Sequence, residues 1–182
     1  MNMITPDEAT GRATAANATS QVIISNYFAI TLGTNFSADG IDFGNLTALP
    51  AVDQNATLNY MPAGAESDVN YTGYNMSVSI DSNVNIDGCI KANDSLKSGS
   101  NLIGLPNYTW ANMSTTNGAN TFWSPAIANS TEITTSDVKS ASGVAPGNDI
   151  LYRFWLDVAV STNPGTYTNT VELKAIKADD TC

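Results

Sequence analysis

Residues 21–32 read QVIISNYFAITL, and side chains of two kinds alternate along this stretch. In an extended chain one face carries Val22, Ile24, Asn26, Phe28, Ile30 and Leu32, and the other carries Gln21, Ile23, Ser25, Tyr27, Ala29 and Thr31. A repeat of two residues with a mainly apolar face is typical of a β-strand that lies on a core. The stretch therefore predicts a strand.

Other parts of the chain show the same alternation. Residues 74–80 and 84–90 flank a turn at residues 81–83, so we predict that they form one hairpin. Residues 150–160 and 167–176 are two more alternating runs, separated by Pro and Gly. No window carries an apolar stripe with helical spacing over ten or more residues. Short strands punctuated by Gly, Pro, Asn and Asp predict an all-β fold, an antiparallel immunoglobulin-like or jelly-roll β-sandwich.

The length of 182 residues suits one domain. Residues 1–20 are small, polar and poor in apolar side chains, and no linker divides the rest of the chain. We therefore expect an N-terminal extension and candidate donor strand at residues 1–32, followed by a β-sandwich at residues 33–182.

Charge and composition exclude several classes of function. Seven Lys or Arg stand against 17 Asp or Glu, which gives a formal net charge of −10, and the chain has no His. Nucleic acid is not an expected partner, because phosphate binding needs a basic stripe. Without His the chain lacks Ser-His-Asp and Cys-His catalysis and His-ligated zinc. Its apolar runs are too short for a transmembrane helix, so we expect no membrane insertion. We expect a protein that is not an enzyme and carries no cofactor.

The asparagines form an unusual number of N-glycosylation acceptors. The chain has 21 Asn and 38 Ser or Thr, and the Asn-x-Ser/Thr pattern is about twice as frequent as random placement gives. The ten acceptors are Asn17, Asn35, Asn45, Asn55, Asn70, Asn75, Asn93, Asn107, Asn112 and Asn129. Dense acceptors predict an extracellular or cell-surface protein with covalent N-linked glycans, from an archaeal or eukaryotic cell. Residues 132–182 contain no acceptor, so this part is expected to face a neighbour.

The two cysteines agree with export. Cys89 and Cys182 are an even number in a chain that otherwise has extracellular features, which predicts one disulfide. Two free thiols, or pairing of Cys182 with a neighbouring subunit, are the alternatives. An intramolecular bond would close a long loop and contribute about 4–5 kcal/mol in the chain-entropy model.

Two groups of residues suggest binding chemistry. Asp81, Asn83, Asn85 and Asp87 place oxygen-bearing side chains at every second position, which is a weak calcium candidate. The alternative is a solvated strand face, because the position that an EF-hand reserves for Gly holds Ile86. Trp110, Trp123 and Trp155 suggest either a sugar-stacking platform or core positions.

Two segments resemble surface fibre proteins. Residues 33–43, GTNFSADGIDF, resemble the segment N-x-F-x-A-G-x-L-D-L that opens the folded domain of the TasA and camelysin group, with Asp39 inserted before the Gly. Residues 154–168, which include FWLDV at 154–158 and PGTYT at 164–168, resemble the closing hairpin of archaeal surface sandwiches. Archaeal filaments of related design, such as bundling pili and threads, assemble by donor-strand complementation from an N-terminal strand. The resemblance covers 11 residues near the front and 15 near the back, and it implies a non-enzymatic fibre subunit.

The sequence therefore predicts a structural subunit of an extracellular, N-glycosylated filament that binds copies of itself head to tail. The side chains expected to insert into the next subunit are Val22, Ile24, Phe28, Ile30 and Leu32. Residues 21–32 would otherwise be an ordinary first strand of their own domain. A carbohydrate-binding or adhesion module, and an S-layer-associated or viral coat subunit, are the alternative functions.

Overall fold

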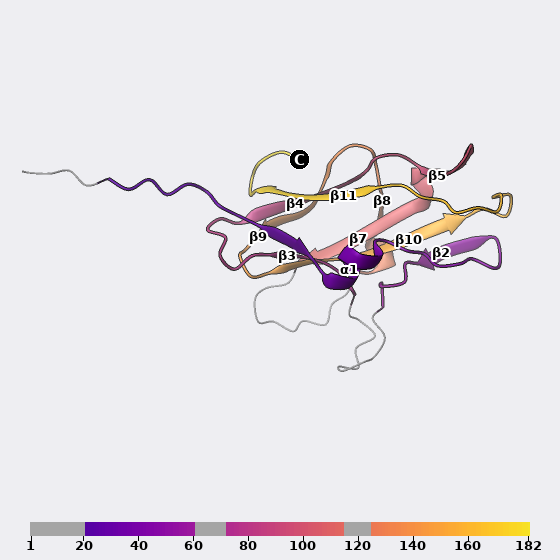
Figure 1. The fold of residues 1–182 in the computed structure, drawn as a ribbon, viewed down its shortest axis with the longest axis horizontal. Coiled ribbons are helices and arrows are strands. Elements are labelled where there is room, and N and C mark those ends of the chain that lie inside the picture. Colours follow the sequence, from indigo (N-terminus) through magenta and orange to yellow (C-terminus); the bar gives the residue numbers. More distant parts are fainter. Residues whose placement is uncertain (1–20, 61–71, 115–124) are drawn as a thin grey trace, which may run out of the picture.

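The computed structural model describes residues 21–60, 72–114 and 125–182 and confirms an antiparallel all-β sandwich (Figure 1). Whether its topology is immunoglobulin-like or jelly-roll stays a prediction. Sheet A contains β1 (Ile30–Leu32), β2 (Ala51–Asn55), β3 (Tyr74–Val78), β7 (Tyr108–Ser114), β8 (Thr131–Glu132) and β10 (Asp149–Val158). Sheet B contains β4 (Ile86–Ala92), β9 (Val138–Val144) and β11 (Val171–Lys177), and β5 (Leu96–Ser98) pairs with β6 (Asn101–Ile103). The helical elements are α1 (Thr34–Asp39), η1 (Leu105–Asn107) and η2 (Ile127–Asn129).

Strand β10 organises sheet A. Along one side it pairs with β7 in a continuous register that sets Phe154 opposite Trp110. Along the other side its first half pairs with β3 and its second half with β2. All residues from Ile150 to Leu156 are buried, so both faces of β10 are covered. The alternation predicted for this strand is therefore real, but its second face is also closed off from water.

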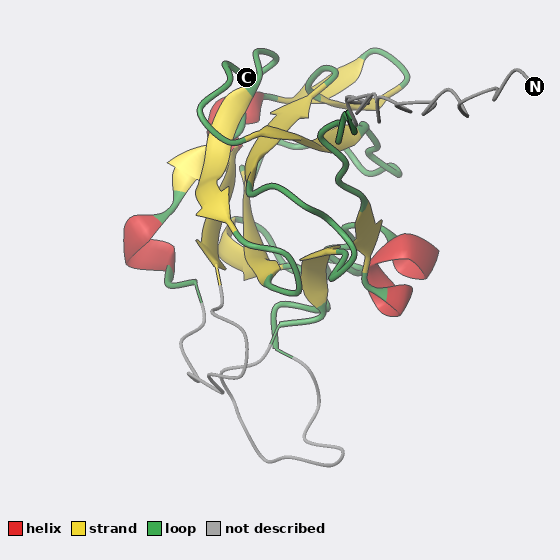
Figure 2. Cartoon of the chain, turned by 90° about the vertical axis from the view of Figure 1, so that its left-hand side faces the viewer, coloured by secondary structure: helices red, strands yellow, loops and turns green. Residues whose placement is uncertain are grey.

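Aromatic rings fill the space between the two sheets. The rings of Phe36, Tyr74 and Phe154 form a chain of contacts, with centroids 5.1 Å apart for the first pair and 5.2 Å for the second, both edge to face. Such pairs contribute about 0.5–1.5 kcal/mol beyond the burial of their area. Seen from the end of the sandwich, the strands surround this common interior (Figure 2). Phe36 comes from α1, a short helix that the sequence pattern did not predict.

The hairpin predicted for residues 74–80 and 84–90 is wrong. Strand β3 lies in sheet A and β4 in sheet B, so the connection between them crosses from one sheet to the other. The two sheets approach closely here: a Cβ on Gly88 would lie 2.7 Å from the Ile150 side chain. Both runs do have an apolar face, but the faces meet across the core and do not lie side by side.

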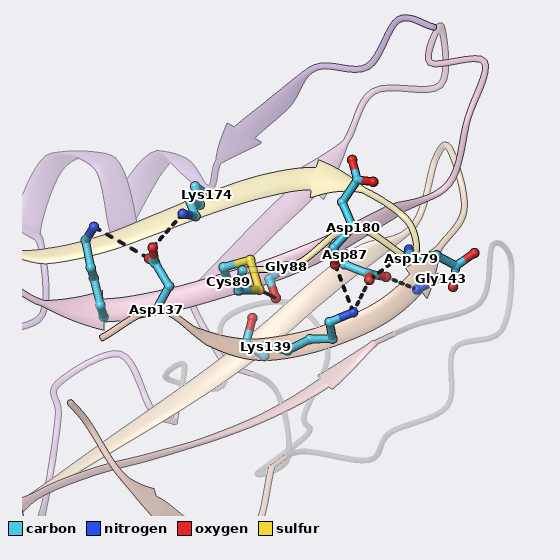
Figure 3. The surroundings of a disulfide bond; sticks show 12 residues. Asp87, Gly88, Cys89, Asp137, Lys139, Gly143, Lys174, Asp179 and Asp180 are labelled. Atoms are coloured by element: carbon cyan, nitrogen blue, oxygen red, sulfur yellow. Dashed lines mark hydrogen bonds and ion pairs between the residues drawn. A yellow bond between two sulfur atoms is a disulfide. The ribbon is translucent and has the colours of Figure 1, made fainter. Parts of the chain in front are cut away.

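The C-terminus is fastened to sheet B (Figure 3). A Cys89–Cys182 disulfide joins the middle of β4 to the last residue, and the sequence separation is 93, so the predicted intramolecular bond is confirmed. Beside it Asp87 is 2% exposed and accepts hydrogen bonds from Lys139 Nζ, from the Gly143 N–H at 2.7 Å and from the Asp179 N–H at 3.1 Å. These bonds tie β4, β9 and the C-terminal segment together.

The environment of Asp87 favours its charged form. Burial alone would raise its pKa, but the hydrogen bonds from Lys139, Gly143 and Asp179 outweigh burial and lower the pKa. A carboxyl with a lowered pKa in the folded state stabilises the fold above its unfolded pKa of about 3.9. This contribution is lost as the pH falls through the folded pKa.

We predict that Asp87→Asn lowers the free energy of unfolding at pH 7 by about 1–3 kcal/mol, because Lys139 loses a charged partner. The loss relative to the unchanged protein should shrink as the pH falls below about 4. Urea unfolding at pH 7 and pH 3 measures both effects. Asp180→Asn changes an exposed carboxylate and serves as the control. An equal destabilisation by Asp87→Asn at both pH values would contradict this account.

Candidate functional site

An apolar segment projects from the sandwich at its N-terminal side. Val22 is 82% exposed, Ile23 80% and Ile24 78%, and residues 21–24 extend away from the two sheets (Figure 1). Three consecutive β-branched side chains in water are unfavourable, since burying each contributes about 1.5–3 kcal/mol. Exposed apolar segments of this kind mark surfaces that bind a partner.

The segment joins its own domain at Ser25. The Asn83 side chain accepts a hydrogen bond from the Tyr27 N–H at 2.8 Å and donates one to the Ser25 carbonyl at 3.0 Å. The Asn83 N–H donates to the Tyr27 carbonyl at 3.0 Å, and the Ala29 N–H donates to Ser82 Oγ at 3.2 Å. Asn83 thus bonds to the backbone of residues 25–27 as a residue of a neighbouring strand would. We call Ser82 and Asn83, with these hydrogen bonds, the anchor.

Beyond this anchor the chain becomes part of sheet A. Strand β1 pairs with β3, with Ile30 opposite Val78 and Leu32 opposite Met76. Phe28 and Ile30 are half-buried against the core, and Leu32 is 40% exposed. The structure therefore divides the five candidate donor residues: Val22 and Ile24 are in solvent, whereas Phe28, Ile30 and Leu32 lie on their own domain.

The candidate glycan acceptors lie where glycans can be carried. Asn35, Asn45, Asn55, Asn93, Asn107 and Asn129 are exposed, Asn75 and Asn112 are half-exposed, and Asn17 and Asn70 lie outside the described residues. The two buried asparagines, Asn59 and Asn148, head no acceptor pattern. Within the described ranges, no asparagine that heads an acceptor pattern is buried.

The four candidate calcium ligands do not share a strand face. Strand β4 begins at Ile86, so of the four only Asp87 belongs to it, and Asp87 is buried beside Lys139. The Asn83 amide binds residues 25–27. The interpretation as a solvated strand face is therefore wrong for Asp87. Within the described ranges no three Cys, Asp or Glu side chains gather into a possible metal site.

The tryptophans also have structural roles where they are described. Trp110 and Trp155 are each 3% exposed, which makes them core positions and not a surface platform. Trp123 lies outside the described residues. None of the described helices is long and apolar enough to cross a membrane.

A polar cavity of about 210 Å³ lies at the end of β10, next to β6. Its lining includes Asn101, Asn107, Asp157, Ser161, Thr162 and Asn163. The Asp157 carboxylate already accepts a hydrogen bond from the Asp53 N–H at 2.7 Å, and Asn163 donates to Asn101 at 2.8 Å. Three of the polar side chains, those of Asn101, Asp157 and Asn163, thus already have hydrogen-bond partners within the protein.

The sequence pattern missed the anchor at Ser82 and Asn83. Asn83 had been grouped with neighbouring oxygen ligands, although Asn after a turn often bonds to nearby backbone. Its actual partners lie 56 and 58 residues away, and no local pattern indicates them.

Comparison with known proteins gives no relative: no family model, curated protein or solved structure matches this chain.

We predict that glycans are attached at the six exposed acceptors, Asn35, Asn45, Asn55, Asn93, Asn107 and Asn129. Occupancy should be lower at Asn75, whose Nδ2 donates to Ser77 Oγ at 3.3 Å, and at Asn112, on the core-facing side of β7. Glycopeptide mass spectrometry of native material measures the occupancy of each position. Highest occupancy at Asn75 and Asn112 would contradict the folded arrangement.

Proposed function

We propose that this protein is a non-enzymatic structural subunit of an extracellular, N-glycosylated surface filament. Copies assemble head to tail, and the N-terminal segment of one copy completes a sheet of the next by donor-strand complementation. The observation that carries the proposal is the segment of residues 21–24, whose Val22, Ile23 and Ile24 are exposed and which extends away from the described sheets (Figure 1).

The free energies indicate that burial of apolar side chains is not sufficient to hold the segment of one copy on the next copy. Full burial of Val22, Ile23 and Ile24 contributes roughly 5–9 kcal/mol. Ordering the backbone of four residues costs roughly 4–8 kcal/mol. Because the two nearly cancel, the net stability of the joint has to come from backbone hydrogen bonds to an acceptor strand. Donor-strand pairing supplies such bonds, whereas non-specific apolar clustering does not.

Other features support an extracellular location. The exposed positions of the described acceptors suit a glycan-covered surface, and the disulfide suits an oxidising compartment. The resemblance of residues 33–43 to the TasA and camelysin group points to the same class of protein. In this proposal the glycans cover the outside of the filament.

A carbohydrate-binding module is the second candidate, and the polar cavity beside Asp157 is the observation that favours it. Binding of the unassembled protein to a glycan array, lost with Asp157→Ala, would support this function in place of assembly.

We predict that a chain that begins at Ser25 folds as a monomer and forms no filaments. It keeps β1, the hydrogen bonds of Asn83 and the disulfide, and it lacks residues 1–24. Size-exclusion chromatography and negative-stain microscopy measure assembly, and the melting temperature reports the fold.

A matched pair of variants separates the segment from general surface effects. Ile24→Asp should abolish filaments, whereas Val160→Asp, at a side chain that is 71% exposed, should leave them unchanged. Filaments at normal yield from the chain that begins at Ser25 would refute the proposal.

A further inference from the structure

To pair with another copy, the free segment at residues 21–24 needs a strand edge that is long, regular and open. Few edges of the described sheets meet these three conditions. In sheet A the outer strands are short: β1 has 3 residues and β8 has 2. Strand β2 pairs with β10 through a register shift, and Asp53 in it has a φ of 52°. In sheet B, β9 pairs with β4 through two register shifts and contains Gly143 with a φ of 62°. Bulges of this kind protect an edge from further pairing.

Strand β11 is different. Its 7 residues pair with β4 without any shift, from Val171 opposite Ala92 to Lys177 opposite Ile86. Over the described residues nothing pairs with its other side. It is the longest regular edge in the part of the chain that the structure describes.

The backbone of β11 shows which groups point outward. Thr170 exchanges hydrogen bonds with Asn93 at one end, and the Ala178 N–H donates to the Asn85 carbonyl at the other. In an antiparallel pair, alternate residues bond to the same neighbour, so the even-numbered residues face β4. The N–H and C=O groups of Val171, Leu173 and Ala175 therefore face the open side.

The same three residues also have incompletely buried side chains. Val171, Leu173 and Ala175 pack on the core but are only half-buried. On the adjacent strand β4, Ile90 is 1% exposed and Ala92 0%. One more strand beside β11 would cover these side chains as β11 itself covers those of β4.

Four charged side chains on and beside β11 form ion pairs with one another. Lys174 bonds to Asp137 at 2.6 Å, and Lys91 lies 3.6 Å from Asp137 and 3.4 Å from Glu172. These four side chains sum to zero charge, so Lys174 is held on the outer face of the sheet by its partner. Unpaired lysines usually guard an edge strand. Lys174 is engaged by Asp137, whereas the exposed Lys177 stands at the last position of β11, beyond Val171, Leu173 and Ala175.

Chain direction gives the orientation of the joint. Residues 83–85 bond to two distant parts of the chain. The Asn83 side chain donates to the Ser25 carbonyl. The Asn85 carbonyl accepts from the Ala178 N–H, just after β11. The free segment and the end of β11 thus lie on the same side of the molecule, and the segment runs outward from there (Figure 1). It points away from its own β11. In copies repeated along this direction, the segment would run antiparallel to β11 of the next copy.

We infer that the outer edge of β11 is the acceptor, and that residues 21–24 of a second copy pair with it through the backbone of Val171, Leu173 and Ala175. This inference rests on the proposed function and adds the site of the joint. It also agrees with the distribution of glycan acceptors, since none occurs in residues 132–182. One glycosylation acceptor, Asn93, follows the end of β4 and accepts a hydrogen bond from the Thr170 N–H just before β11.

A binding experiment tests the location separately from the function. A fluorescent peptide of residues 1–26 is titrated into the domain that begins at Ser25, and anisotropy reports binding. We expect saturable binding that Ala175→Pro weakens at least tenfold, because proline removes an N–H that faces the open side and leaves the β4 ladder intact. Ala175→Ser is the control and should bind normally. Hydrogen exchange of the unaltered domain, with and without peptide, should show new protection in β11 and requires no variant to fold.

Equal binding by Ala175→Pro and Ala175→Ser, or protection outside β11, would place the acceptor elsewhere and overturn the inference. Absence of peptide binding would overturn it as well. Failure of the proposed function gives a different result, namely filaments from the chain that lacks residues 1–24.

Discussion

Backbone hydrogen bonding at the edges of the two sheets is the constraint on which the rest of the structure depends. At one edge of sheet A the anchor formed by Ser82 and Asn83 satisfies the backbone of residues 25–29, and β1 continues the pairing. The anchor ends at Ser25, and residues 22–24 before it are exposed, with no hydrogen bond to the rest of the described chain. At the same time, no strand of the described ranges pairs with the outer side of β11 in sheet B. In the proposed assembly, the exposed segment of one copy pairs with the open edge of β11 in the next copy.

The remaining interactions stabilise the folded subunit and make pairing through its other strand edges less favourable. The disulfide and the buried Asp87 hold the C-terminal segment on β4. They therefore stabilise the part of sheet B that lies next to the open edge of β11. Bulges protect β9, and short length protects β1 and β8. The exposed glycan acceptors lie outside β9, β10 and β11. Among the described strands, protection of β1, β8 and β9 leaves β11 as the long regular edge, and one such edge favours a single mode of association, which a filament requires.

Alternation in the sequence predicted the strands well but not their partners. Tyr74, Met76 and Val78 do face the core, as do Tyr152, Phe154 and Leu156, and the disulfide is also confirmed. The pattern could not tell that β3 and β4 belong to different sheets, because an apolar face fits a hairpin and a sandwich equally well. Residues 21–32 show the same limit. A free segment and a docked strand have the same period of two, and the boundary between them depends on Asn83, more than 50 residues away.

A cryo-electron microscopy map of the native assembly tests the central claim most directly, because it shows where residues 21–24 of each copy lie. The account predicts that residues 21–24 form an added antiparallel strand beside β11 of the neighbouring copy, with Val22 and Ile24 on one face of that strand and Ile23 on the other. Residues 21–24 that remain in solvent within a filament, or that fold onto the sheet of their own copy, would contradict it.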